Sequence, residues 1–308
     1  MCQMEKSDHT LSKGKLQSTQ IPETKWSEIS IDFVTDLPKS SRNRDSILVV
    51  VDKATRMVHL APCSKGINAT DTARLLWNTV VKLHGVPRVI YSDRGSQFTA
   101  ESWRELWRLT GTRLAYSTAY HPQTQGVVER MNSVIEQCIR CTIHESGNIY
   151  DWEKILSTVE LAINSLPNKS TGFSPFYLNY GYEPILPIQL IKGDEEIRTE
   201  SIGSFVRRVT SDWELAKENL QRAVGLQQKY YNRKHRDVQF AVGDLVLLST
   251  RNLKMRGIPD KLKKRFMGPF KIQERIGQQA HRLLLPETWK VHPVFHISLL
   301  KKWNAVDL

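Results

Sequence analysis

The order of two hydrophobic periodicities between Ile29 and Asn164 constrains the fold more than any other feature. Alternating or continuous apolar stretches predict three successive antiparallel strands, at residues 29–34, 46–52 and 57–62. Helical and strand-like spacings then alternate, which predicts a helix over 68–85, a strand over 88–93, a helix over 103–109, a strand over 113–117, and helices from about 127 and over 151–164. Such an order builds one mixed sheet with helices packed on it.

This order is typical of the α/β ribonuclease H-like class, in which helices pack on a mixed five-stranded sheet. Beyond about residue 187 the pattern changes twice. An apolar stripe at helical spacing, from Val206 to Ala223, is either the packed side of one helix or a dimer seam. From Phe240 onward short strand patterns return, and they predict a small all-β barrel.

Charge indicates the kind of partner. Lys and Arg number 44 against 32 Asp and Glu, and the formal net charge of +12 favours a polyanion such as nucleic acid. The sequence has no signal peptide and no apolar run near the roughly 20 residues of a transmembrane segment, so we expect an intracellular protein. We also expect Cys138 and Cys141 to be ordinary core residues rather than metal ligands.

Three acidic residues occupy positions that can converge. Asp32 lies within a strand, Asp93 ends another strand, and Glu129 lies in the first turn of a long helix. A carboxylate on a core strand is costly without a cationic partner, and the two Mg²⁺ ions of phosphoryl transfer enzymes prefer such hard oxygen ligands. The alternative is that the two aspartates are strand-end caps and that Glu129 is a charge favoured by the helix dipole. The three positions alone leave both interpretations open.

Spacing and motifs then point to a known family. Asp93 and Glu129 are separated by 35 residues. With the segments WSEISIDFVTDLP, LVVVDKATRMVHLAP, YSDRGSQFTAESW, STAYHPQTQGVVERMN, GDLVLLST and RFMGPFKI, this spacing resembles the integrases of gypsy-type long-terminal-repeat retrotransposons, which are relatives of retroviral integrases. The resemblance runs from Trp26 to Trp303.

The resemblance implies a role for individual residues. Asp32, Asp93 and Glu129 match the family's metal-binding acids, so two Mg²⁺ (or Mn²⁺) ions are expected to support DNA 3′-end processing and strand transfer. It also implies nuclear DNA as substrate, both donor ends and target duplex, and a homo-oligomer with no membrane partner. The residues expected in the loops around the active site are Ser92, Gly95, Gln97, Tyr120, His121, Pro122, Gln123 and Gln125.

The family comparison also predicts the domains. The family's zinc-binding module is represented only by Cys2, so we expect that module to be truncated and no zinc to be bound. Residues 1–24 are then a flexible remnant, and residues 25–185 form the catalytic core. A helical linker over 186–236 is expected to lead to a Src-homology-3-like barrel over 237–305, whose Gly268, Pro269 and Phe270 match the signature of the family's C-terminal module.

A basic segment in that barrel is the expected DNA-binding surface. Between Arg251 and Arg275, nine Lys and Arg stand against two acidic residues. A charge run is usually only a solvated surface, but this one lies inside a small barrel and includes Phe266 and Phe270, which suits contact with DNA phosphates. The residues expected to contact DNA are Arg251, Lys254, Arg256, Lys261, Lys263, Lys264, Arg265 and Lys271.

Two other interpretations compete with a retroelement integrase. Another metal nuclease of the same fold, a ribonuclease H or a transposase, fits less well because of the barrel and the 35-residue spacing. A DNA-binding or architectural protein derived from such an integrase, inactive or adopted by its host, is the alternative from a different functional class.

Overall fold

The chain divides into two compact units in a computed structural model. One unit contains residues 19–224, and the other contains residues 225–308 together with the segment around Ser12–Lys13. The structure describes residues 4, 12–13, 21–116, 126–146, 150, 152–186, 201–233, 235–236, 238–250, 264–277, 279–286, 289 and 291–303. None of the helices described in those ranges is long and apolar enough to cross a membrane.

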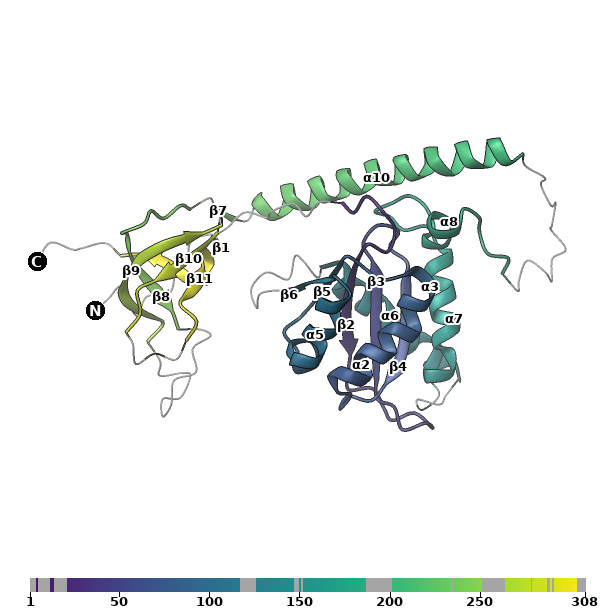
Figure 1. Cartoon of the computed structure of the whole chain (residues 1–308), viewed down its shortest axis with the longest axis horizontal. Helices are drawn as coiled ribbons and strands as arrows, with labels where there is room; N and C mark the ends of the chain where they lie inside the picture. Colours follow the sequence, from purple (N-terminus) through teal and green to yellow (C-terminus); the bar gives the residue numbers. More distant parts are fainter. Residues whose placement is uncertain are drawn as a thin grey trace, which may run out of the picture. The chain divides into compact units, whose positions relative to one another are not determined.

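A mixed five-stranded sheet forms the centre of the first unit (Figure 1). Strands β2 (Glu28–Val34), β3 (Ser46–Asp52) and β4 (Val58–Cys63) are antiparallel, whereas β5 (Val89–Ser92) and β6 (Arg113–Tyr116) run parallel to β2. The strand order is β4-β3-β2-β5-β6. All five predicted strands and the ribonuclease H-like arrangement are therefore confirmed.

Alternating side chains place one hydrophobic core on each face of the sheet. Ile29, Ile31, Leu48 and Val50 pack with the helices on one face, and the neighbouring positions of the same strands pack with those on the other. Every residue of β3 is buried, because the central part of the sheet is covered on both sides.

The first helical segment covers one face and contains an irregular turn. Helix α2 (Ala69–Leu76) begins at the predicted cap, where the Asn68 side chain accepts a hydrogen bond from the Asp71 amide. A π-helical turn, Trp77–Val81, separates it from α3 (Lys82–His84), which ends at Gly85. The wider turn rotates the apolar side, so that Val81 is buried and Leu83, predicted on the packed face, is 56% exposed.

The same face carries two further helices. The predicted helix after Asp93 is α5 (Glu101–Leu109), which buries Trp103 and Trp107. A one-turn helix that the sequence analysis did not predict, α4 (Ser96–Thr99), precedes it and buries Phe98. The Tyr116 hydroxyl on β6 donates to the Phe98 carbonyl at 2.8 Å and holds this turn against the sheet.

The opposite face is covered by α6 (Gly126–Ser146) and α7 (Trp152–Ser165). Val128, Ile135 and Trp152 are fully buried there. Cys138 packs partly against this core, as expected. The expectation for Cys141 was wrong, because its side chain is exposed.

Helix α10 (Ile202–Arg233) follows α8 (Pro175–Tyr180) in the described chain. Ala216 and Leu220 of the predicted stripe are buried, whereas Val206 is 54% exposed. Within the first unit, the Asn219 amide donates to the Thr171 carbonyl at 2.9 Å. The central part of the stripe is thus the packed side of one helix.

The second unit is an all-β domain of the predicted kind (Figure 1). Its sheet has the order β11-β10-β9-β8-β12, built from β8 (Leu245–Ser249), β9 (Phe266–Ile276), β10 (Ala280–Leu283), β11 (Val294–His296) and β12 (Leu300–Lys302). A 3-10 turn, Ile297–Leu299, joins the two outer strands of that order. A second, small pairing joins β1 (Ser12–Lys13) in parallel to β7 (His235–Arg236), which the sequence analysis did not predict.

Candidate active site

Asp32 projects from β2 and is held by two hydrogen bonds. Its Oδ1 accepts from the Phe33 amide at 2.8 Å, and its Oδ2 accepts from the Asn132 side-chain amide at 3.0 Å. The side chain is half-buried, next to the fully buried Ile31. Asp32 is therefore oriented by helix α6, which carries Asn132.

Asp93 follows the last residue of β5 and shapes the loop after it. Its Oδ1 accepts from the Gly95 amide at 2.9 Å, and the buried Ser92 hydroxyl donates to its carbonyl at 3.0 Å. Gly95 fits closely: a Cβ added there would lie 2.6 Å from Gln97 Nε2 and 3.0 Å from Asp93 Oδ1. Ser92, Gly95 and Gln97 thus surround Asp93 in one compact turn.

The sheet register brings the two aspartates to the same edge. Strands β2 and β5 are parallel neighbours, with Ser30 paired to Tyr91. Asp32 and Asp93 each lie two residues beyond that pair, toward the carboxyl ends of the two neighbouring strands. Both side chains therefore lie at the carboxyl ends of adjacent strands, where open α/β sheets bind their ligands.

Helix α6 brings a third position toward this edge. Glu129 lies in its first turn, three residues before Asn132, and residues three apart share one side of a helix. The Glu129 side chain lies outside the described part of the structure. Asn132 was missed by the sequence analysis, although its spacing from Glu129 was a usable signal. Its Oδ1 is buried and has no hydrogen-bond partner among the described atoms.

The donor set fits a divalent ion of the magnesium type. Two carboxylates and a buried amide oxygen offer hard oxygen ligands and a hydrogen-bond acceptor, with no thiolate or imidazole among them. Among the side chains that the structure describes, no cluster of three His, Cys, Asp or Glu is complete. The Glu129 side chain is not among those described.

Some of the other predicted site residues lie outside the described ranges. The ones outside are Tyr120, His121, Pro122, Gln123 and Gln125 in the loop before α6, and Arg251, Lys254, Arg256, Lys261 and Lys263 in the basic segment. Lys264, Arg265 and Lys271 are described, and all three are exposed. Gly268 of the predicted signature has φ 126°, and an added Cβ would lie 3.0 Å from the Val246 carbonyl oxygen, so only glycine fits.

A second polar region lies along the outer strand β4. Asn164 on α7 both donates to and accepts from the Val58 backbone, each at 2.9 Å. One turn earlier, Glu160 Oε2 accepts from the Leu60 amide at 2.8 Å. At the end of the strand, Arg44 donates to the Pro62 carbonyl at 3.1 Å. Side chains thus replace a neighbouring strand along β4.

Histidines connect the same strand to α3 and α7. His59 Nδ1 lies 2.8 Å from Glu160 Oε1, and His59 Nε2 lies 2.8 Å from His84 Nε2. The Trp26 ring stacks on His84, with centroids 3.8 Å apart. Burial, with a smaller contribution from His59, lowers the pKa of His84 to about 4. His84 is therefore neutral near pH 7 and hydrogen-bonded to His59.

Comparisons with known proteins define the class. Residues 22–122 match the family model described as integrase core domain, and residues 243–304 match the one described as Tf2-1-like, SH3 domain. The chain thus carries an integrase core domain with a ribonuclease H-like fold, followed by an SH3-like all-β domain.

Particular relatives are retrotransposon proteins. The chain is 30% identical over 307 residues to the Tf2-3 and Tf2-4 transposon polyproteins of Schizosaccharomyces pombe. The alignments cover 98% of this chain but 22% of each polyprotein, so the chain spans about a fifth of their length. The similarity to these polyproteins therefore extends over nearly the whole of this chain.

A solved structure supports the fold. The chain resembles the simian T-cell lymphotropic virus intasome determined in complex with PP2A regulatory subunit B56 gamma, with a TM-score of 0.60 and 16% identity. The match covers 98% of this chain and 86% of that one. At such low identity the likeness establishes the fold alone.

Proposed function

We propose that this chain is the catalytic part of a gypsy-type retrotransposon integrase, a polynucleotidyl transferase that processes DNA 3′ ends and joins them to target DNA. The observation that carries the proposal is the convergence of three elements on one sheet edge. Asp32 lies near the carboxyl end of β2, Asp93 follows the parallel neighbour β5, and Asn132 links Asp32 to the helix that carries Glu129.

Asp32, Asp93 and Glu129 are the proposed ligands of two Mg²⁺ or Mn²⁺ ions. When bound, such an ion pair lowers the pKa of the attacking water or hydroxyl and stabilises the leaving oxygen. The Asn132 amide fixes one oxygen of Asp32, and the Gly95 amide fixes one oxygen of Asp93. With the Phe33 amide on the other oxygen of Asp32, these bonds keep both carboxylates oriented, which reduces the reorganisation needed during the reaction.

DNA is the proposed substrate and partner. The formal net charge of +12 and the exposed Lys264, Arg265 and Lys271 support contact with phosphates. The same assignment includes a nuclear location and a homo-oligomeric assembly on DNA ends. The domain limits of 25–185 and 237–305 belong to the same proposal.

Replacement of one aspartate tests the mechanism. We expect Asp93→Asn to abolish both end processing and strand transfer in magnesium, because the amide removes a charge that the ion pair needs. Binding of a short duplex is expected to stay within about twofold, since affinity comes mainly from phosphate contacts. A labelled donor duplex resolved on a denaturing gel measures both reactions.

Asp36→Asn is the matched control. Asp36 is an exposed aspartate on the loop after β2 with φ 65°, a backbone conformation that asparagine tolerates. It should retain full turnover. Unchanged turnover in Asp93→Asn would refute the mechanism. A wild-type chain that binds DNA but shows no joining would instead favour an inactive or host-adopted DNA-binding protein.

A further inference from the structure

The turn that connects β2 to β3 is closed by its own hydrogen bonds. The Ser40 amide donates to the Arg44 carbonyl at 2.7 Å, and the Asn43 amide donates to the Ser40 carbonyl at 2.8 Å. Asn43 has φ 59°, which asparagine adopts more readily than most residues. The buried Ser40 hydroxyl also accepts from the Arg42 and Arg44 amides, at 3.3 and 3.2 Å. The turn is therefore preorganised.

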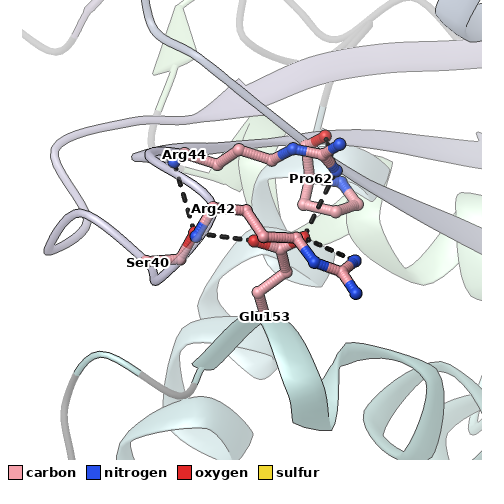
Figure 2. Close-up of polar contacts among 5 residues, drawn as sticks. All are labelled: Ser40, Arg42, Arg44, Pro62 and Glu153. Atoms are coloured by element: carbon pink, nitrogen blue, oxygen red, sulfur yellow. Dashed lines mark hydrogen bonds and ion pairs between the residues drawn. The ribbon is translucent and has the colours of Figure 1, made fainter.

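A buried carboxylate on α7 holds two guanidinium groups beside this turn (Figure 2). Glu153 accepts from the Ser40 hydroxyl at 2.6 Å, and its other oxygen lies 3.4 Å from Arg42 and 3.3 Å from Arg44. The Glu153 side chain is only 8% exposed. The Arg44 guanidinium is fixed further by its bond to the Pro62 carbonyl (Figure 2).

One carboxylate cannot neutralise both arginines. Two positive charges meet one negative charge, which leaves an excess of one at this turn. The Arg42 side chain is 75% exposed, and its 3.4 Å contact is longer than a normal charge-assisted hydrogen bond. Arg42 can therefore turn its remaining N–H donors to an external anion without breaking a strong bond.

The turn lies at the same sheet edge as the candidate active site. It follows the carboxyl end of β2, and Arg44 bonds to Pro62 near the carboxyl end of β4. Strand β4 runs parallel to β2 and is separated from it by β3 alone. Two strand spacings amount to roughly 10 Å. A duplex whose phosphate lies at Asp32 and Asp93 is wide enough to reach the arginines.

We propose that Arg42 and Arg44 form a second DNA-phosphate contact, separate from the basic segment of the all-β domain. The inference rests on the proposed function, because it takes DNA as the ligand. The paired N–H donors of a guanidinium group match two oxygens of a phosphate. Glu153 holds the guanidinium groups of Arg42 and Arg44 in place before DNA binds. Proximity to the paired aspartates favours nucleic acid over an acidic protein at this turn.

The salt dependence of DNA binding tests this contact. With the full chain, fluorescence anisotropy of a labelled duplex gives the affinity at a series of salt concentrations. We expect Arg42→Gln to weaken binding several-fold and to lower the slope of log affinity against log salt by about 0.9, the value for one phosphate contact. Neither change should depend on duplex sequence, because phosphate contacts do not read bases.

Two further variants make the test specific. Arg108→Gln is the matched control, because Arg108 is 69% exposed but is fully paired by two bonds to Glu105, at 2.7 and 2.8 Å. It should leave the slope unchanged. Glu153→Gln keeps an acceptor for Ser40 but removes the charge that holds both guanidinium groups in place, so it should weaken binding although both arginines are still present. Circular dichroism verifies that each variant is folded.

The outcomes of the salt-dependence experiment can be distinguished from those of the joining assay that tests the active site. A slope for Arg42→Gln equal to that of the wild type would overturn the phosphate contact. The contact would also be overturned if Arg42→Gln bound DNA as the wild type does but bound a poly-glutamate peptide more weakly. That result would make the turn a binding surface for acidic proteins. Full joining activity in Asp93→Asn would overturn the proposed mechanism but leave the binding result for Arg42 as it stands.

Discussion

At the scale of single residues, the site depends on amides that orient carboxylates. A carboxylate that accepts one fixed hydrogen bond keeps its second oxygen in a defined direction. Asp32 receives such a bond from Asn132, and Asp93 receives one from the Gly95 amide. Because Asn132 lies on α6 and Asp32 on β2, a displacement of either element changes the orientation of the Asp32 carboxylate.

Removal of the Asn132 amide should lower turnover with little effect on DNA binding. A hydrogen bond to a charged group contributes about 1.5 to 3 kcal/mol, which corresponds to a rate loss of roughly 10-fold to 100-fold if the bond persists in the transition state. We expect Asn132→Ala to lose that much in end processing. Single-turnover kinetics and duplex affinity, measured together, separate the two effects.

Gln137→Ala is the control for that experiment, because Gln137 is exposed on the same helix. It should match the wild type in both measurements. If Asn132→Ala weakened DNA binding and left the single-turnover rate unchanged, Asn132 would be a substrate contact and would not position Asp32.

At the scale of elements, a histidine pair holds α3 against the edge of the sheet. His84 is neutral in the folded chain because burial lowers its pKa to about 4, below its ordinary value of 6.5. The unfolded chain therefore binds the proton first as pH falls. The stability that neutral His84 provides is complete above pH 6.5 and is lost between pH 6.5 and about 4.

His84→Gln should remove part of that acid sensitivity. We expect the free energy of unfolding of the wild type to fall more steeply over this pH window than that of the variant, because glutamine binds no proton. Urea unfolding of the full chain at several pH values measures the difference. The exposed His292 gives a control, His292→Gln, that should follow the wild type. Parallel curves for His84→Gln and the wild type would contradict the assignment.

Elements with a simple period were predictable from the sequence, and irregular ones were not. Alternation placed β2, β3 and β4 within a residue or two, and the Asn68 cap fixed the start of α2. The π-helical turn at Trp77–Val81 has no period of its own, so the exposure of Leu83 could not be predicted. The one-turn α4 is too short to show a helical spacing.

The candidate site was predictable in the same uneven way. Asp32 within one strand and Asp93 at the end of another led us to expect that the two residues converge at the carboxyl edge of the sheet. The turn at Ser40–Arg44 is visible only in three dimensions, because its partner Glu153 lies 113 residues from Ser40. The spacing of Asn132 from Glu129 was a signal in the sequence, but its bond to Asp32, 100 residues away, was not. Nothing in the local sequence distinguishes Arg42 from other exposed arginines.

At the scale of the whole molecule, the second unit has a core of its own. Val246, Leu248, Ile272 and Leu283 are buried in it, and every member of that hydrophobic cluster lies between residues 238 and 300. A core that draws on one continuous segment is what allows a domain to fold alone.

An isolated segment of residues 237–305 should therefore fold as an all-β domain. We expect a cooperative thermal transition and slowly exchanging amides in β8 and β9, which pair along most of their length. Leu248→Ala, in its centre, should lower stability by about 2 to 5 kcal/mol, whereas the exposed Leu245→Ala should change it little. A circular dichroism spectrum of random coil would contradict the prediction.

The covered outer strand has a consequence for how copies of this chain behave when crowded. An unprotected strand edge invites another sheet to dock by backbone pairing, the first step of strand-mediated aggregation. Asn164, Glu160 and Arg44 already occupy backbone groups of β4 that such a neighbour would need. At the other edge, β6 has only four residues and begins with the exposed Arg113. Many copies can therefore reach a high local concentration without their sheets pairing edge to edge.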